Sequence, residues 1–531
     1  MQKRAGTLIA AGALIAGAVG AAPSAAEPPA PEPRTPSSLS WTACGTARYP
    51  KLECASLRVP LDHADPDGER ITLALSRVRH TARTFDGPLL VNPGGPGASG
   101  RDLAGFVAAS LPAELAARYD VIGFDPRGTG ASRPALTCRP DHFAPVRPDP
   151  VPRDAREERR GAARAAAFAR ACGDAHGRLL PHMGTVAAAR DMDAIREALG
   201  APRVNYFGYS YGTYLGAVYA KLYPHRVRRA VLDSVVHPGG VWYDANLAQD
   251  HAFDARHKAF LAWVARHDRV YGLGGDPARV EDRWYAMRAA LREAPADGRV
   301  GAAEVEDTFL PGAYHDGYWP LLAAAFSAYA KEGDGGPLVA AYESLAAPDE
   351  STANAYAGYT AVECRDAPWP RSWGVWHRDM WAAHAKAPFS TWNNAWYNAP
   401  CAFWPVPSLT PPDVANAAVP PMLLFQATED AATPYEGALA AHRMLAGSRL
   451  VVERGGGNHA VTLRGNACAD RVLVRYLDTG EVPRGDDGDG PDTVCPARPA
   501  PVPSAAADPA RAAREAPPAV HGALAARAHG G

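Results

Sequence analysis

The sequence carries no excess of positive charge, and lysine in particular is scarce. The formal net charge is −2 over 531 residues, so there is no basic field to attract nucleic acid or an anionic membrane. No C-x-x-C pair and no group of neighbouring histidines and cysteines is present, so we expect no metal and no other cofactor. Internal repeats are absent as well. The hydrophobic fraction of 47% is that of an ordinary globular protein with a sizeable core.

The N-terminus carries an apolar run that is short for a membrane span, and no second stop-transfer segment accompanies it. A basic start, Gln2 to Arg4, precedes "GTLIAAGALIAGAVGAA", and the small residues of "APSAAE" suit signal peptidase. A buried or anchoring N-terminal helix is the alternative. We predict a signal peptide at residues 1–26, a secreted protein, and no membrane attachment once the signal is removed.

Proline-rich segments flank the predicted globular part. Residues 27–40 include "EPPAPEPRTPSS" and are predicted to form a linker or propeptide. Residues 498–531 are rich in alanine and proline, and we expect this tail to be largely disordered.

The cysteine count agrees with export. An even number of cysteines in an exported chain favours disulfides over metal binding. Eight cysteines allow 105 connectivities, so sequential pairing is a preference rather than a deduction. The four sequential couples are Cys44/Cys54, Cys138/Cys172, Cys364/Cys401 and Cys468/Cys495.

An alternation of strand-like and helix-like segments begins at about residue 56. Several near-continuous apolar runs, each followed by a loop and a helical pattern, indicate a mostly parallel sheet covered by helices on both faces. Between about 240 and 412 this alternation stops, and the pattern becomes helical and then rich in tryptophan. We therefore predict an α/β core at residues 41–239, an inserted helical cap at 240–412, and the second part of the core at 413–497.

The stretch "NYFGYSYGTYLG" places Ser210 between Gly208 and Gly212. A strand-like run precedes it and a helix-like run follows, which is the setting of a nucleophile elbow. The amide of Tyr211 would then lie at a helix N-terminus, ready to donate to an oxyanion. An ordinary glycine-rich bend is the alternative. We take Ser210 as the candidate nucleophile.

Two later residues supply a candidate base and a group to orient it. His459 follows the strand-like run "RLVVERGGGN", and Asp430 follows "MLLFQATE" one strand–helix unit earlier. The order serine, aspartate, histidine is the one expected for a serine hydrolase on such a sheet. Glu429 is the nearest competitor to Asp430, and His63 and His182 are expected to be surface or structural histidines.

The segment "NPGGPGASG", residues 92–100, follows an earlier strand-like run. Successive glycine amides approach an oxyanion closely, so Gly95, or alternatively Gly94, is expected to be the second donor beside Tyr211. A phosphate loop is excluded because its Lys-Ser/Thr ending is absent. The segment "DPRGTG" is expected to be a structural turn next to the site, and Asp125 is a weaker catalytic candidate.

Several segments together resemble the secreted, Streptomyces-type tripeptidyl aminopeptidases of actinomycetes, a branch of the proline-iminopeptidase-like α/β-hydrolases. The segments are "NPGGPGASG", "GFDPRGTGAS", "GYSYGTYLGAVYA", "AVECRDAPWP", "WNNAWYNAPCAFWP", "DAATPYEGA" and "GGGNHAVT…NACADRVLVRYL". The resemblance extends from about Trp41 to Cys495. It implies an α/β-hydrolase fold with Ser210 as nucleophile, His459 as base and Asp430 as its orienter. It also implies release of tripeptides from free N-termini of peptides or proteins. Pro93 departs from the wider iminopeptidase pattern, which has histidine there.

An exopeptidase needs a group that holds the substrate's ammonium at a fixed distance from the nucleophile. Carboxylates do this through charge-assisted hydrogen bonds, and Glu363 and Asp366 are the candidates. Alternatively, these two carboxylates are surface charges or ion-pair partners of Arg365. The tryptophans between Trp369 and Trp404 are predicted either to line an apolar substrate slot or to pack the interior.

The sequence thus predicts a monomeric, secreted serine exopeptidase that hydrolyses peptides through an acyl-enzyme. A secreted esterase or acyltransferase is the alternative that the same triad would serve. A binding protein with a decayed site belongs to a different class, and the intact triad argues against it. Residue preference and the number of residues released per cut are not readable from the sequence.

Overall fold

The computed structural model describes residues 39–485 and 490–506. The predicted signal peptide at 1–26, nearly all of the predicted linker at 27–40, and most of the tail lie outside the described residues. In the described part, no helix combines the length and apolarity that crossing a membrane requires.

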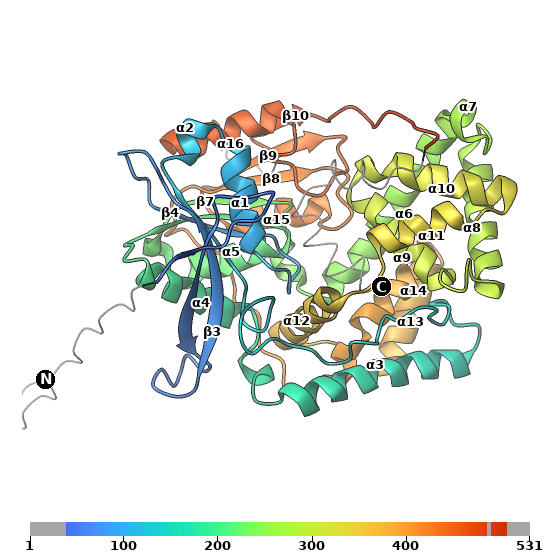
Figure 1. Cartoon of the computed structure of the whole chain (residues 1–531), viewed down its shortest axis with the longest axis horizontal. Coiled ribbons are helices and arrows are strands. Elements are labelled where there is room, and N and C mark those ends of the chain that lie inside the picture. Colours follow the sequence, from blue (N-terminus) through green and yellow to red (C-terminus); the bar gives the residue numbers. More distant parts are fainter. Residues whose placement is uncertain (1–38, 486–489, 507–531) are drawn as a thin grey trace, which may run out of the picture. The chain divides into compact units, whose positions relative to one another are not determined.

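A ten-stranded sheet in the order β1-β2-β3-β5-β4-β6-β7-β8-β9-β10 forms the centre of the core (Figure 1). The first three strands pair antiparallel, and β3 is also antiparallel to β5. All later neighbours run parallel. The strands are β1 (Thr42–Ala43), β2 (Glu53–Pro60), β3 (Arg70–Val78), β4 (Pro88–Asn92), β5 (Asp120–Phe124), β6 (Val204–Tyr209), β7 (Val227–Asp233), β8 (Leu423–Ala427), β9 (Arg449–Arg454) and β10 (Thr493–Pro496).

Alternate residues of the parallel strands point to opposite faces, and each face is covered by helices. Leu89 and Phe207 pack with α1 (Arg101–Ser110) and α16 (Ala467–Thr479) in one apolar cluster. Leu90 and Tyr206 pack in another, which includes α4 (Thr185–Ala198), α5 (Tyr211–Leu222) and α15 (Tyr435–Met444). The strands are therefore buried on both faces, which explains their continuous apolar sequence. The fold is that of an α/β-hydrolase.

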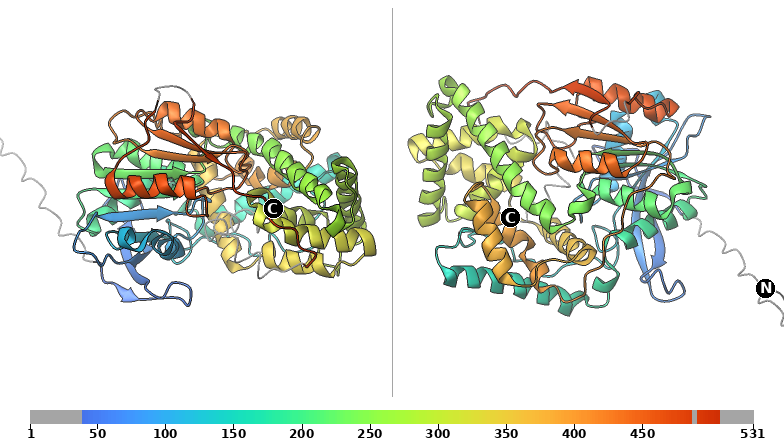
Figure 2. Two further views of the ribbon diagram at one scale, coloured as in Figure 1. Left: turned by 90° about the horizontal axis from the view of Figure 1, so that it is seen from above. Right: turned by 180° about the vertical axis from the view of Figure 1, so that it is seen from behind.

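Between β7 and β8 the chain leaves the sheet and forms only helices. Those between 243 and 345 bury a separate apolar core of their own, and both views of Figure 2 show them, in green to yellow, grouped beside the sheet. The inserted helices are η3 (Pro238–Gly240), α6 (Tyr243–Arg266), α7 (Asp268–Tyr271), α8 (Pro277–Glu293), α9 (Ala302–Tyr314), η4 (Asp316–Tyr318), α10 (Trp319–Glu332), α11 (Gly336–Leu345), α12 (Glu350–Asp366), α13 (Trp373–His384), α14 (Thr391–Asn398) and η5 (Ala399–Phe403).

One long helix from the first part of the core joins this insertion. Helix α3 (Ala155–His176) packs along α14 and η5, and Figure 1 shows it beside α13 and α14. The predicted boundaries at 239/240 and 412/413 stay predictions. The remaining short helices are α2 (Ala113–Ala116), η1 (Leu180–His182) and η2 (Pro224–Arg226).

Four disulfides join the same sequential couples that the sequence favours. They are Cys44–Cys54, Cys138–Cys172, Cys364–Cys401 and Cys468–Cys495, and no free cysteine remains in the described part of the chain. The second joins the loop before α3 to α3 itself, and the third joins α12 to η5.

Candidate active site

Ser210 lies on the sharp turn between β6 and α5, with φ of 57° and ψ of −128°. This conformation is costly for a residue with a side chain, and the flanking glycines make room for it. A Cβ on Gly208 would lie 2.5 Å from the carbonyl oxygen of Gly212, and one on Gly212 would lie 2.9 Å from the carbonyl oxygen of Asn92. The turn leaves Ser210 9% exposed, at the wall of a cavity.

The glycine loop after β4 packs directly against this turn. Gly94 has φ of +98°, and a Cβ there would lie 2.8 Å from the Cβ of Ser210 and 3.1 Å from the amide nitrogen of Tyr211. The amide of Gly94 already donates to Asn92 Oδ1 at 2.9 Å. Gly95 lines the same cavity as Ser210 and Tyr211, so of the two glycines it is the better placed to donate to a ligand there.

Asp430 and His459 are in direct contact. Nδ1 of His459 donates to Asp430 Oδ2 at 2.8 Å, and the two side chains are almost completely buried. Asp430 also accepts from the amide and hydroxyl of Thr433. Burial by itself would raise the pKa of Asp430, but the adjacent His459 and the Thr433 hydrogen bonds outweigh it and hold that pKa below its ordinary value. A proton on Nδ1 leaves Nε2 of His459 as the basic nitrogen.

The buried Nε2 of His459 has no hydrogen-bond partner among the described residues. Its ring lies edge-on to the ring of Tyr314, with 5.5 Å between centroids, and Tyr314 lines the cavity together with Ser210. The backbone amide of His459 donates to the carbonyl oxygen of Tyr314 at 2.8 Å. The inserted helix α9, which ends at Tyr314, thus helps to place the histidine.

Asp233, at the end of β7, connects the serine turn to the histidine loop. Its backbone carbonyl accepts from the amide of Ser210 at 2.9 Å. Its carboxylate accepts from the amide of Val461 at 2.9 Å, and from the amide and hydroxyl of Thr462 at 2.7 and 2.6 Å. Burial raises the pKa of Asp233 to about 6, against these hydrogen bonds and the nearby His459. The sequence interpretation missed this residue, although it lies at the carboxyl end of a parallel strand, as Asp430 lies just past the end of another.

The weaker candidates lie elsewhere. Glu429 is largely exposed and faces Arg256 at 3.9 Å. His63 pairs with Asp191 at 2.9 Å, and His182 lies 4.0 Å from Asp62.

Asp125 is buried between two loops of the core. It accepts from the hydroxyl of Ser99 at 2.5 Å and from the amides of Gly100 and Ala131. Burial raises its pKa, while these hydrogen bonds lower it. The residue therefore holds the glycine loop against the "DPRGTG" turn, and it does not line the cavity at Ser210.

The cavity at Ser210 has a volume of about 350 Å³. The core contributes the serine turn, the glycine loop and residues 432–437, and the insertion contributes α6, Tyr314 and Glu363. Three carboxylates line it, from Asp244, Glu363 and Glu436, whereas no lysine or arginine does so among the described lining residues. No lysine or arginine among the described lining residues balances these carboxylates, which favours a cationic group on the ligand.

Glu363 and Asp366 lie one turn apart on α12 but have different surroundings. Glu363 is buried, lines the cavity, and accepts a hydrogen bond from Asn246 Nδ2 at 3.5 Å. Asp366 accepts from the amide and hydroxyl of Thr185 at 2.7 and 2.5 Å, at the start of α4. Burial raises the pKa of Asp366 to about 6, against the two hydrogen bonds from Thr185. Asp366 does not line the cavity among the residues described, so the geometry separates the two candidates.

Four of the seven tryptophans of 369–404 are buried, and the other three are partly buried and pack against them. The ring of Trp376 lies nearly parallel to those of Trp369 and Trp373, 5.8 Å from each, and Trp373 also stacks on Trp396. None of the seven lines the cavity at Ser210 in the described structure. Of the two interpretations, packing therefore describes them better than a substrate slot.

Comparisons with known proteins identify the family of the chain. A family model described as "TAP-like protein" matches residues 387–495. A "Tripeptidyl aminopeptidase" of Streptomyces lividans is 43% identical over 476 residues, covering 86% of this chain and 87% of that protein. The "Serine protease Hip1" of Mycobacterium tuberculosis is 32% identical over 480 residues, covering 84% and 89%. A "Carboxylesterase B" of the same organism is 32% identical over 469 residues, covering 84% and 88%. The chain belongs to the tripeptidyl aminopeptidase family of α/β-hydrolases.

Proposed function

We propose that the protein is a secreted serine exopeptidase that releases tripeptides from the free N-termini of peptides and proteins. The observation that carries the proposal is a cavity whose lining includes both a strained serine, Ser210, and a buried carboxylate, Glu363. Membership of the family supports the same activity. The four disulfides and the composition of residues 1–26 support export.

In the proposed reaction the hydroxyl of Ser210 attacks the carbonyl carbon of the third residue of the substrate. Nε2 of His459 takes the serine proton and then gives it to the departing amine. Asp430 keeps the imidazole in the required tautomer and stabilises its cation. A water molecule, activated by the same nitrogen, then hydrolyses the acyl-enzyme.

The amides of Gly95 and Tyr211 are the proposed donors to the oxyanion. Tyr211 is the first residue of α5, where amides have no partner inside the helix. Gly95 approaches the same cavity from the glycine loop. Donors held in place before the reaction stabilise the developing negative charge without reorganisation.

Glu363 is the proposed anchor for the substrate's ammonium group. A carboxylate that is buried beside the cavity forms a stronger charge-assisted hydrogen bond than an exposed one. A fixed distance from this anchor to Ser210 would make the enzyme count residues from the N-terminus. Asp366 is left out of the proposal because Thr185 holds its carboxylate away from the cavity.

A secreted esterase or acyltransferase is the second candidate, and similarity to the carboxylesterase favours it. The two functions differ in their need for the ammonium anchor. No cofactor and no partner besides the substrate enter the proposal, and we propose that the enzyme acts as a monomer.

One defined peptide tests the proposal. The enzyme should release an intact N-terminal tripeptide, detected by mass spectrometry, and acetylation of the peptide's N-terminus should block the cut. Hydrolysis of short acyl esters with no cleavage of the free peptide would instead favour the esterase. Labelling of wild type but not Ser210→Ala by a fluorophosphonate probe would assign the nucleophile.

A further inference from the structure

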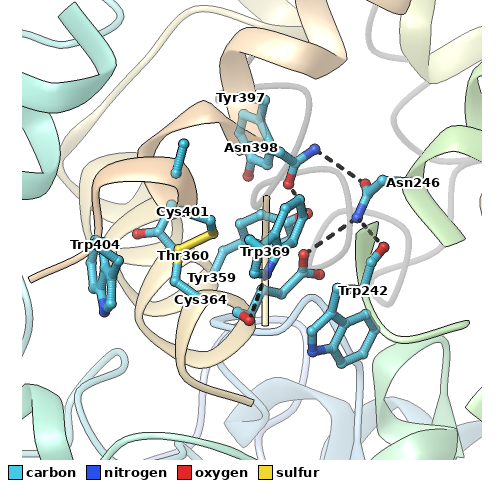
Figure 3. Close-up of a disulfide and its surroundings, with 12 residues drawn as sticks. Trp242, Asn246, Tyr359, Thr360, Cys364, Trp369, Tyr397, Asn398, Cys401 and Trp404 are labelled. Carbon is cyan, nitrogen blue, oxygen red and sulfur yellow. Dashed lines mark hydrogen bonds between the residues drawn. A yellow bond between two sulfur atoms is a disulfide. The ribbon is translucent and has the colours of Figure 1, made fainter. Parts of the chain in front are cut away.

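Glu363 lies at one end of a chain of buried side-chain amides. Nδ2 of Asn246 donates to Glu363 Oε2 at 3.5 Å, a long hydrogen bond, and to the carbonyl oxygen of Trp242 at 3.0 Å. Nδ2 of Asn398 donates to Asn246 Oδ1 at 3.1 Å. Figure 3 shows the amides of Asn246 and Asn398 facing each other. These hydrogen-bonded side chains extend from the interior of the insertion to the wall of the substrate cavity.

The donors and acceptors of these residues determine the direction of each hydrogen bond between them. Both groups at the Nδ2 end of Asn246, the Trp242 carbonyl and the Glu363 carboxylate, only accept. A reversed Asn246 amide would place an oxygen against these two acceptors and an NH₂ against the NH₂ of Asn398. Such unpaired buried groups are costly. Asn398 therefore keeps the donor of Asn246 aimed at Glu363.

Asn398 is itself held in place. The hydroxyl of Tyr359 donates to Asn398 Oδ1 at 2.8 Å, and Nδ2 of Asn398 also donates to the carbonyl oxygen of Asn394 at 3.0 Å. The disulfide joins Cys364, next to Glu363, to Cys401, three residues after Asn398. The helix that bears the carboxylate is thus covalently connected to η5, which directly follows Asn398.

We propose that Asn398 is a positioning residue for recognition of the substrate's ammonium group. It acts through Asn246 on Glu363, so that the carboxylate presents a constant geometry to the substrate. The proposal rests on the function proposed above. Asn398 is not among the described residues that line the cavity at Ser210; it borders a separate small space with Asn246 and Trp369. Its proposed effect on the substrate is therefore indirect, through Asn246, which lines that cavity and contacts Glu363.

The test compares a substrate that has an ammonium group with one that lacks it. For Asn398→Ala we expect kcat/KM on a free-amine tripeptide p-nitroanilide to fall about tenfold, mainly through KM, because the Asn246 amide loses the donor that fixes it and its hydrogen bond to the Glu363 carboxylate is weakened. Hydrolysis of p-nitrophenyl acetate should stay within about twofold, since the triad is untouched. In a Glu363→Gln background, Asn398→Ala should cause no further loss, because the two residues act in series.

Asn393 provides the matched control. It lies on the same helix, is equally buried, and donates to Asp307 at 2.8 Å, but it borders a different cavity. Asn393→Ala should change the rates on both substrates by the same factor. Tyr359→Phe removes the hydroxyl that holds Asn398 and should reproduce the substrate-dependent loss at smaller size, even if Asn398→Ala does not fold.

The outcomes separate this inference from the proposed function. Equal losses on both substrates for Asn398→Ala and Tyr359→Phe, or a full further loss in the Glu363→Gln background, would overturn the positioning role. If Glu363→Gln changes the ratio between the substrates and neither of the other variants does, only the positioning role is wrong. If Glu363→Gln leaves that ratio unchanged, the ammonium anchor itself is wrong.

Discussion

The sheet core and the helical insertion contribute to the same cavity in different ways. The core places Ser210, Asp430 and His459 in turns or loops that follow parallel strands. The carboxyl ends of parallel strands lie at the same edge of a sheet, so these loops are neighbours. The insertion places Glu363 and Asn246 from helices far apart in sequence, held by amide–amide hydrogen bonds and a disulfide. The comparison suggests that the core supplies reactivity toward any acyl group, whereas the insertion supplies selection of the substrate.

Ser210→Ala breaks the core's contribution completely. We expect kcat to fall about a millionfold on peptides and esters alike, as for the loss of a nucleophile that works as a unit with its base. Steady-state kinetics on both substrate types measures this. Residual peptide cleavage near the wild-type rate would contradict the assignment of the nucleophile.

Glu363→Gln breaks the insertion's contribution alone. We expect a loss of about a hundredfold in kcat/KM on free-amine tripeptide amides, because the variant keeps the shape of the side chain but removes its charge. Simple esters should be hydrolysed at nearly the wild-type rate. Asp366→Asn, one turn away on α12, is the matched control and should leave the ratio between the two substrates unchanged.

Asp233→Asn tests whether catalysis depends on the hydrogen bonds that hold the loop after His459. The amide of asparagine cannot accept from Val461 and Thr462 at both positions, so His459 should lose part of its placement. We expect kcat to fall about tenfold on peptides and esters together. A loss confined to free-amine peptides would assign Asp233 to substrate selection instead and weaken the division between the two regions.

The exposed carboxylates at the cavity should contribute less to substrate selection than the buried Glu363. Asp244→Asn with Glu436→Gln should lower kcat/KM on free-amine peptides about threefold at low salt, because exposed charges act weakly and over a distance. The difference should vanish at high ionic strength. Glu332→Gln, an exposed residue outside the cavity, is the control. A loss that persists in high salt would indicate direct contact with the substrate.

Asp366→Asn should affect stability rather than activity. It weakens the hydrogen bonds to Thr185 at the start of α4, which typically costs about 1 kcal/mol. The pKa of Asp366, raised from 3.8 to about 6, means that its contribution to stability is fully present below pH 3.8 and is lost as pH rises through about 6. The destabilisation by Asp366→Asn should therefore shrink as pH rises through this window. Urea unfolding at several pH values measures it, and a constant difference would contradict the assignment.

The core was largely predictable because its sequence pattern is repetitive. Each parallel strand is a short apolar run, and in an α/β sheet polar residues just after such runs gather at one edge. Asp430 and His459 could be selected from many acids and histidines on this ground. Asp233 satisfies the same rule and was missed because its role is to hold backbone amides, which no motif records.

The insertion was predictable only as a helical region. Helical periodicity shows which face of a helix is buried but not which neighbour covers it, so Glu363 and Asp366 were equivalent in the sequence. Their different partners, Asn246 and Thr185, come from α6 and α4. The tryptophans were equally ambiguous until the structure showed that Trp369, Trp373 and Trp376 stack on one another and do not line the cavity at Ser210.

By itself the sequence determined the fold class, the family resemblance and the order of the three candidate catalytic residues, because strand order and glycine turns are local properties of the chain. Only the tertiary structure decided which acid faces the cavity, which glycine amide is free of Asn92, and how Asn398 reaches Glu363 through Asn246. These depend on contacts between segments distant in sequence, and such contacts are set by packing of the whole core rather than by any local pattern.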